Sequence, residues 1–171
     1  MKLQRKYWIL FLVSPLILIL DQLTKWWVVE RFRYGESLSI IPGFFNFTYI
    51  RNTGAAFGIL AQANPTFRVP FFVIVPLVAL ISIGLIFRRL PSADLKLSTA
   101  LSLVIGGAVG NLIDRVTLNY VVDFLDFHWR YDYHFPAFNI ADSAICVGVA
   151  VLMWDLMTQP DSPLNGETTK S

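Results

Sequence analysis

The chain has 171 residues, of which 55% are hydrophobic and 15% are charged, and its formal net charge at pH 7 is +2. Soluble domains have about 25% charged residues, so this composition predicts a small α-helical integral membrane protein. The low net charge, without a run of Lys and Arg, argues against nucleic-acid binding. The single cysteine excludes an internal disulfide and a cysteine-rich metal site.

The first twenty residues imitate a secretory signal, because a basic start precedes an apolar stretch. No cleavage site of the small-x-small type follows, and apolar residues resume after Asp21 and Lys25. This segment is therefore interpreted as a retained membrane helix. A bilayer-spanning helix needs about 20 residues, and four segments fit that length, at roughly 8–29, 67–88, 97–115 and 137–157.

The third predicted span is short and rich in small residues, with Gly106 and Gly110 in a GxxxG pair. Small residues at this spacing let another helix approach closely, so both glycines are interpreted as packing residues. Residues 1–158 are expected to form a single membrane-embedded domain. The polar residues 159–171 are expected to form a flexible cytoplasmic tail.

Positive charge is dense before the first span and in the short turn between the second and third spans. It is sparse in the longer loops, 30–66 and 116–136. By the positive-inside rule, both termini are expected in the cytoplasm and both long loops outside. The basic residues concerned are Lys2, Arg5, Lys6, Arg88, Arg89 and Lys96.

In the first outer loop, residues 44–50 read FFNFTYI, and aromatic residues occupy every second position. This alternation is typical of a β-strand. Turn signals flank it, Pro42-Gly43 before and Asn52-Thr53-Gly54 after. The pattern predicts a small β-sheet at the outer membrane surface, where aromatic side chains are common.

Polar residues gather at the outer ends of three spans and in the two outer loops. A charged group inside a membrane helix costs at least about 2.5–3.5 kcal/mol on insertion scales, so several together predict a functional site. We expect this site near the outer leaflet. Its candidate residues are Asp21, Lys25, Asn52, Asn111, Asp114, Arg115, Asp123, Asn139, Asp142 and Ser143.

Each of these residues also has a structural interpretation. The acid–base pairs in the first and third spans (Asp21 with Lys25, Asp114 with Arg115) can be ion pairs that only stabilise the helices. The three asparagines can satisfy backbone groups or link helices as readily as they contact a substrate. Asp142 lies too far inside its apolar run to be expected as a helix cap. Asp126 is expected to be a solvated loop residue.

Asp123, placed on a loop, and Asp142 form the best chemical pair. Two carboxylates held close together in a partly dehydrated site do not readily both ionise, so one keeps a proton while the other acts as base. Such a pair can activate a water and protonate a peptide carbonyl oxygen. His128 and His134 lack a third ligand, so no metal or other cofactor is expected. Cys146 is interpreted as a small packing residue.

Five motifs resemble those of the lipoprotein signal peptidase family, also called signal peptidase II, and they occur in the same order as in that family. They are Asp21-Gln-Leu-Thr-Lys25, Asn52-Thr-Gly-Ala-Ala-Phe-Gly58, Gly106-Gly-Ala-Val-Gly-Asn-Leu-Ile-Asp-Arg115, Val121-Val-Asp-Phe124 and Phe138-Asn-Ile-Ala-Asp-Ser143. The resemblance implies an aspartic endopeptidase of the bacterial inner membrane, with a β-cradle and an active site near the periplasmic face. Its substrate would be a diacylglyceryl-modified prolipoprotein, cleaved just before the lipidated cysteine.

The resemblance also implies roles for individual residues. Asp123 and Asp142 would be catalytic. Besides its substrate, the protein would contact membrane lipids and would bind cyclic-peptide inhibitors such as globomycin. A monomer is expected. The alternative is a proton-coupled transporter, although the sequence lacks the related halves and midplane site of that class. The site-supporting residues implied by the resemblance are Asp21, Lys25, Asn52, Gly54, Asn111, Asp114, Arg115 and Asn139.

Overall fold

The computed structural model describes residues 4–55, 59–129, 133–158 and 164. Four helices in this part of the chain are long and apolar enough to cross a membrane, which confirms the four predicted spans. The helices are α1 (Arg5–Arg31), α2 (Pro65–Arg89), α3 (Leu95–Leu118) and α4 (Ile140–Thr158), and the strands are β1 (Ser37–Ile41), β2 (Phe45–Asn52), β3 (Val121–Trp129) and β4 (Tyr133–His134).

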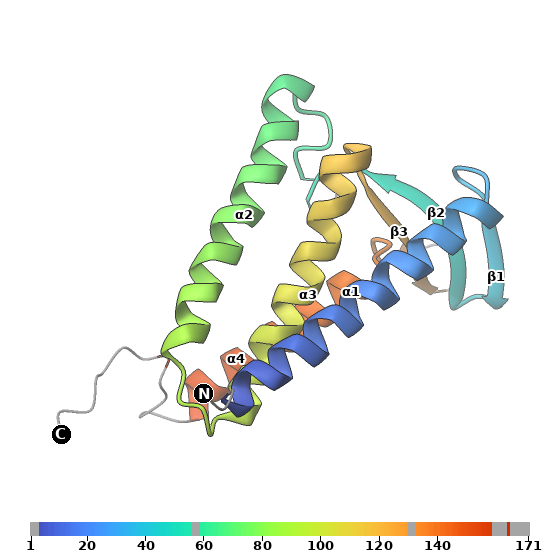
Figure 1. The fold of residues 1–171 in the computed structure, drawn as a ribbon. Helices are drawn as coiled ribbons and strands as arrows, with labels where there is room; N and C mark the ends of the chain where they lie inside the picture. Colours follow the sequence, from blue (N-terminus) through green and yellow to red (C-terminus); the bar gives the residue numbers. More distant parts are fainter. Residues whose placement is uncertain (1–3, 56–58, 130–132, 159–163, 165–171) are drawn as a thin grey trace, which may run out of the picture.

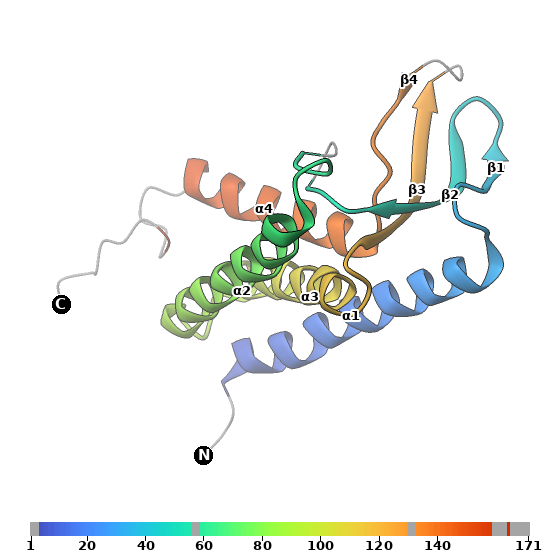
Figure 2. The same ribbon diagram turned by 90° about the horizontal axis from the view of Figure 1, so that it is seen from above.

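Helix α3 is the centre of the bundle and packs against α1, α2 and α4. Figures 1 and 2 show it between the other helices, with the sheet beyond one end of the bundle. Among the residues of the peripheral helix α2, only Phe72 and Phe87 are buried. Many of its other apolar side chains, such as Ile74, Val78 and Ile81, are exposed, as suits a helix surrounded by lipid.

Two glycines let α1 approach α3 closely, as predicted. A Cβ atom on Gly106 would lie 2.8 Å from the carbonyl oxygen of Ser14. A Cβ atom on Gly110 would lie 2.5 Å from the Asp21 carboxylate, so this glycine makes the space in which that carboxylate lies. The packing stripe of α3 therefore also shapes the polar layer.

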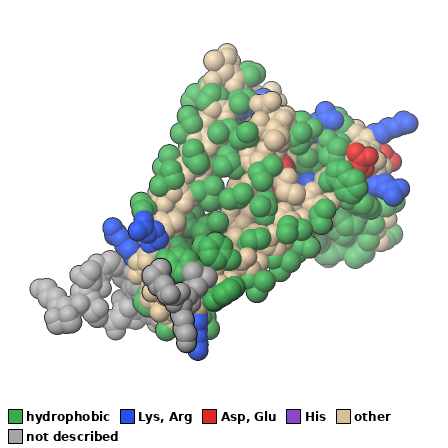
Figure 3. Space-filling model, viewed as in Figure 1, with side chains coloured by type: hydrophobic (Ala, Val, Ile, Leu, Met, Phe, Trp, Pro, Cys, Tyr) green, Lys and Arg blue, Asp and Glu red, His purple; other side chains and the backbone are tan. Residues whose placement is uncertain are grey.

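The start of α1, the α2–α3 turn and the end of α4 lie together at the end opposite the sheet (Figure 1). There the buried Lys6 ammonium donates hydrogen bonds to the carbonyl oxygens of Phe87, Arg88 and Leu90, at 3.3, 2.9 and 2.6 Å. Lys96 forms an ion pair with the buried Asp155. Figure 3 shows hydrophobic side chains over much of the helical surface, with charged side chains gathered toward the two ends.

The sheet is antiparallel in the order β1-β2-β3-β4. The strand predicted at 44–50 is confirmed as β2, which begins one residue later and ends two residues later. The prediction that Asp123 lies on a loop is wrong, because residues 121–129 form β3. Residues Val121 to Phe124 are all buried, so this stretch lacks the polar alternation of a half-exposed strand. Val28, Tyr49 and Phe124 belong to one apolar cluster that joins the sheet to α1.

Helix α4 begins at Ile140, three residues later than the predicted span 137–157. The preceding segment pairs with β3 instead, because the Phe138 N–H donates to the Leu125 carbonyl oxygen at 3.1 Å. The predicted tail 159–171 lies outside the described residues except for Leu164, which packs near Phe87.

Candidate active site

The predicted site residues lie at the sheet end of the bundle, where one continuous network of hydrogen bonds and ion pairs joins them. They come from three helices, two strands and the loop after β2. Asp21 and Lys25 come from α1, Asn111, Asp114 and Arg115 from α3, Asn52 and Asp123 from β2 and β3, Gly54 from the loop, and Asn139 and Asp142 from the start of α4.

The Lys25 ammonium is the centre of one half of the network. Its nitrogen lies 2.8 Å from an Asp21 oxygen, 3.0 Å from an Asp114 oxygen and 2.9 Å from the Asn111 side-chain oxygen. Three acceptors therefore match its three donors. The predicted Asp21–Lys25 pair is confirmed. The predicted pairing of Asp114 with Arg115 is wrong, because successive residues on a helix point in different directions.

We call Lys25 and its two ion-pair partners, Asp21 and Asp114, the Lys25 cluster. Both acids of this cluster also hold backbone segments of neighbouring elements in place. The Asp21 carboxylate accepts a hydrogen bond from the Ala141 N–H at 2.9 Å, and Asp114 accepts one from the Val122 N–H at 3.1 Å. The first contact ties α1 to α4, and the second ties α3 to β3. Asn119, at φ 64°, ends α3 in the left-handed conformation and turns the chain into that strand.

Sequence reasoning did not select Gln22, although it completes the Lys25 cluster. Its amide donates to Asp114 at 3.0 Å, and to Asp21 and the Gly110 carbonyl oxygen at 3.2 Å each. The only signal in the sequence was its place next to Asp21 within the first motif. A neutral amide in a membrane helix carries a smaller insertion penalty than a charge and therefore stands out less.

Asn139 and Asp142 form a reciprocal cap at the start of α4. The Asn139 side-chain oxygen accepts from the Asp142 N–H at 2.9 Å, while an Asp142 oxygen accepts from the Asn139 N–H at 3.2 Å. This is the capping-box arrangement, with Asn and Asp in the two positions. The expectation that Asp142 lies too deep to serve a cap is wrong, because α4 starts at Ile140.

Two asparagines hold the two candidate catalytic carboxylates in one place. Asn139 donates to Asp123 at 2.8 Å, and Asn111 donates to Asp142 at 2.7 Å. The asparagines are themselves joined, because the Asn139 amide also lies 3.2 Å from the Asn111 oxygen. Asn52 donates to the second oxygen of Asp123 at 3.0 Å. Within the described chain, neither carboxylate forms an ion pair with Lys or Arg.

Asp123 lies outside the spanning helices, on β3, with 2% of its surface exposed. Burial, and to a smaller extent the nearby negative charge of Asp142, raise the pKa of its carboxyl group to about 7. The hydrogen bonds from Asn52 and Asn139 act against this shift. A buried acid with this pKa can hold a proton near neutral pH.

A cleft of about 870 Å³ opens beside these two carboxylates. Asp123 and Asp142 both line it, whereas the acids of the Lys25 cluster do not. Polar and apolar side chains share the wall, as in many ligand sites. The other lining residues include Tyr34, Arg51, Asn52, Asn111, Arg115, Phe135, Phe138, Ser143, Ile145 and Cys146.

The loop after β2 closes one side of the cleft and leaves no room at Gly54. A Cβ atom there would lie 2.5 Å from the Ile59 carbonyl oxygen and 2.9 Å from the Ala61 nitrogen. Two arginines hold the loop, with Arg115 donating to the Gly54 carbonyl oxygen at 3.4 Å and Arg68 to that of Ala61 at 2.6 Å. Arg68 was not selected from the sequence, because it precedes the apolar part of its span.

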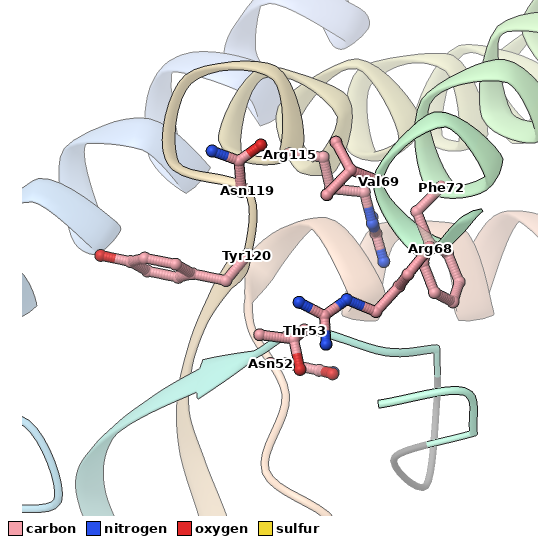
Figure 4. Close-up of a pocket in the computed structure, with 8 residues that line it drawn as sticks. All are labelled: Asn52, Thr53, Arg68, Val69, Phe72, Arg115, Asn119 and Tyr120. Atoms are coloured by element: carbon pink, nitrogen blue, oxygen red, sulfur yellow. The ribbon is translucent and has the colours of Figure 1, made fainter. Parts of the chain in front are cut away.

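Figure 4 shows the small pocket next to this loop. Arg68 extends from α2 toward Thr53, and Arg115 reaches toward the same space from α3, while Asn119 and Tyr120 lie on the other side. The volume of this pocket is only about 10 Å³, so it has room for no more than a water. We therefore assign the candidate site to the larger cleft.

Two further expectations are wrong. Asp126 is buried on β3, where it accepts hydrogen bonds from Asn46 at 3.3 Å and Thr48 at 3.4 Å, and it is not a solvated loop residue. Cys146 is exposed on the cleft wall instead of packed between helices. Among the described residues, no group of three His, Cys, Asp or Glu side chains is placed to hold a metal ion.

The fold and the site define a multi-pass membrane protein with a carboxylate pair in a cleft at one end of its helices. A family model described as signal peptidase (SPase) II matches residues 13–158. The chain belongs to this family and is a membrane peptidase, which confirms the resemblance seen in the five motifs.

Named relatives agree with this assignment. A lipoprotein signal peptidase from Syntrophotalea carbinolica is 52% identical over 85% of this chain and 88% of its own length. One from Geobacter metallireducens is 48% identical over 88% and 91%, respectively. A solved bacterial membrane enzyme structure, determined by the in meso method at 2.3 Å resolution, matches with a TM-score of 0.79 and 35% identity, covering 95% of this chain and 93% of the other.

Proposed function

We propose that this protein is an aspartic endopeptidase that removes the signal peptide from diacylglyceryl-modified prolipoproteins, cleaving just before the lipidated cysteine. Family membership supports the removal of signal peptides from lipoproteins. The observation that carries the chemistry is the Asp123–Asp142 pair, which lines an open cleft and is held by amides.

Near neutral pH the pair carries one proton, and we assign it to Asp123 because its pKa is raised to about 7. Asp142 then takes a proton from a water whose oxygen attacks the carbonyl carbon of the scissile peptide bond. Asp123 gives its proton to the carbonyl oxygen, forming a neutral tetrahedral intermediate. When this collapses, the C–N bond breaks, the amine nitrogen takes the proton from Asp142, and the hydroxyl proton returns to Asp123.

The other site residues position this pair. Asn52, Asn111 and Asn139 fix the carboxylate oxygens, so the acids need no reorganisation before the reaction. The Lys25 cluster does not line the cleft, and its role is to hold α1, α3 and α4 in their relative positions. Arg115 lines the cleft and holds the Gly54 loop.

We further propose that the enzyme is a monomer in the bacterial inner membrane, with both termini in the cytoplasm. The basic residues near the α2–α3 turn support this orientation, which puts the cleft near the periplasmic face. A lipid-anchored substrate with an apolar signal helix would reach the cleft from within the bilayer. Residues 1–158 act as one domain, and globomycin-type cyclic peptides would block the cleft.

Cleavage of a purified diacylglyceryl prolipoprotein, compared with the same protein lacking the lipid, tests this function. We expect release of the signal peptide from the lipidated form only, inhibition by globomycin and no effect of a metal chelator. Equal cleavage of both forms would contradict the substrate assignment. Loss of activity with the chelator would contradict a mechanism that uses only the Asp123–Asp142 pair. Substrate-driven proton uptake without cleavage would instead favour the transporter alternative.

A further inference from the structure

Arg51 carries a positive charge into the cleft on a frame of three tyrosines. Its Nε donates a hydrogen bond to the Tyr49 hydroxyl at 3.0 Å. The centre of its guanidinium group lies 5.0 Å from the ring centroid of Tyr34, 5.3 Å from that of Tyr49 and 5.1 Å from that of Tyr120. Cation–π contacts of this kind restrict a side chain that would otherwise be mobile at a surface.

The frame leaves the charge of Arg51 available to a ligand. The side chain is exposed, and the hydrogen bond to Tyr49 raises the pKa of its guanidinium group, so the group stays protonated. Within the described residues, this side chain donates a hydrogen bond through its Nε alone. Its two terminal NH₂ groups present the fork of donors that fits a carboxylate.

Arg51 lines the same cleft as the candidate catalytic pair. In the β2–β3 ladder Arg51 is opposite Val122 and Ile50 is opposite Asp123, so the side chains of Arg51 and Asp123 leave opposite faces of the sheet and meet the cleft around the end of the strand. The following residue, Asn52, donates a hydrogen bond to the Asp123 carboxylate. An extended peptide advances about 3.3 Å per residue, so a side chain two or three positions from the cleaved bond would come within reach of Arg51.

The two ends of the cleft differ, and this difference decides which side of the cleaved bond faces Arg51. Ile145 and Cys146 line the cleft from within α4, whereas Tyr34 and Arg51 come from the loop and strand beyond the helices. The apolar signal helix suits the α4 end. The chain that follows the lipidated cysteine therefore passes the end where Arg51 lies.

We propose that Arg51 is a specificity-determining residue that selects substrates with an acidic side chain at the first or second position after the lipidated cysteine. This inference rests on the proposed function. A phospholipid phosphate is the less favoured ligand, because Arg51 lines the same cleft as Asp123 and its hydrogen-bond partner Tyr49 is buried in the core.

The test measures kcat/KM of the full-length enzyme in zwitterionic nanodiscs. Three diacylglyceryl prolipoproteins are compared that differ only in carrying Asp, Ser or Lys at those two positions. For the wild type we expect Asp over Ser by about three- to fivefold, and a similar ratio of Ser over Lys, since one exposed ion pair is involved. The preference should weaken at high salt.

Arg51→Gln should bring all three substrates to the same kcat/KM, and Arg51→Glu should reverse their order. Tyr34→Leu removes one exposed face of the frame and should weaken the preference. Arg31→Gln is the matched control, because Arg31 is exposed at the end of α1 and does not line the cleft, so it should keep the wild-type ratio. Each ratio is taken within one variant, so a general loss of activity does not affect it.

An active wild type that cleaves the three substrates equally would overturn the role of Arg51 and leave the proposed function intact. Failure of the wild type to cleave any of them would refute the proposed function itself. If Arg51→Gln altered only the response to anionic lipid in the nanodisc, the ligand would be a lipid phosphate and the inference would be wrong.

Discussion

Two groups of buried acids share one polar layer, and they differ in how their charge is balanced. Asp21 and Asp114 both contact the ammonium of Lys25, and each also accepts one hydrogen bond from a backbone N–H and one from the Gln22 amide. Asp123 and Asp142 contact amides and face a cleft. The first arrangement neutralises charge and holds helices together. The second places two carboxyl groups, which have no ion-pair partner among the described residues, beside a cleft, and this is the arrangement that the proposed shared proton requires.

The largest expected effect follows from removing either carboxyl group of the second pair. Asp123→Asn and Asp142→Asn keep the size of the side chain and one of its two hydrogen-bonded oxygens but cannot exchange the proton. We expect kcat to fall by about 10³-fold or more, since general acid–base groups contribute about 10²–10⁴-fold each. Cleavage assays on lipidated substrate measure the loss, and thermal unfolding should show nearly wild-type stability.

Asp126→Asn is the matched control for this pair, since Asp126 is also a buried carboxylate on β3 but does not line the cleft. It should retain most of the activity. If it lost as much activity as Asp123→Asn, the effect would come from the strand and not from the dyad.

The next largest effect should come from the Lys25 cluster, and it should appear in stability. Lys25→Met leaves Asp21 and Asp114 buried without their cation, which costs about 3–5 kcal/mol when one partner of a buried pair is removed. Denaturant unfolding in mild detergent measures this loss. Adding Asp21→Asn and Asp114→Asn should recover part of it. A Lys25→Met enzyme with wild-type stability but no activity would show that the cluster acts in catalysis.

The pH dependence separates the two groups further. The pKa of Asp123 is raised to about 7 in the folded protein, from 3.8 for an ordinary Asp, so its protonated form favours folding. That contribution is fully present below about pH 4 and is lost as the pH rises to about 7. Asp123→Asn should remove this part of the pH dependence of unfolding.

Activity should follow the same titration. Above about pH 7, kcat should fall up to tenfold per pH unit, because Asp123 loses the proton that it gives to the carbonyl oxygen. Initial rates between pH 5 and pH 9 measure the profile. A rate that increased steadily across this range would contradict the assignment of the proton to Asp123.

The sequence predicted the helices and most of the polar layer because both carry large energies. A long apolar run has few alternatives to a membrane helix, and a charge inside one is costly enough to stand out. Strand β3 was missed because burial of successive residues removed the alternation that identifies strands. Gln22 was missed because a neutral amide carries a smaller insertion penalty than a charge. Arg51, on β2, and Arg68, in the first turn of α2, were missed because a charge outside the apolar core of a span carries no such penalty.

The smallest expected effect concerns the loop that closes the cleft, and it compares two glycines. Gly54→Ala would push a methyl group into the backbone of Ile59 and Ala61, whereas an alanine at Gly84 on α2 would meet nothing within 4 Å. We expect Gly54→Ala to lower kcat/KM by about tenfold through displacement of the loop, since misplacement by about 1 Å can cost up to about 10²-fold. Gly84→Ala should keep wild-type kinetics, because α2 packs at the edge of the bundle. Equal kinetics for the two variants would mean that the Gly54 loop can move aside without disturbing the carboxylate pair, and that the hydrogen bonds from Asn52 and Asn139 are enough to fix Asp123.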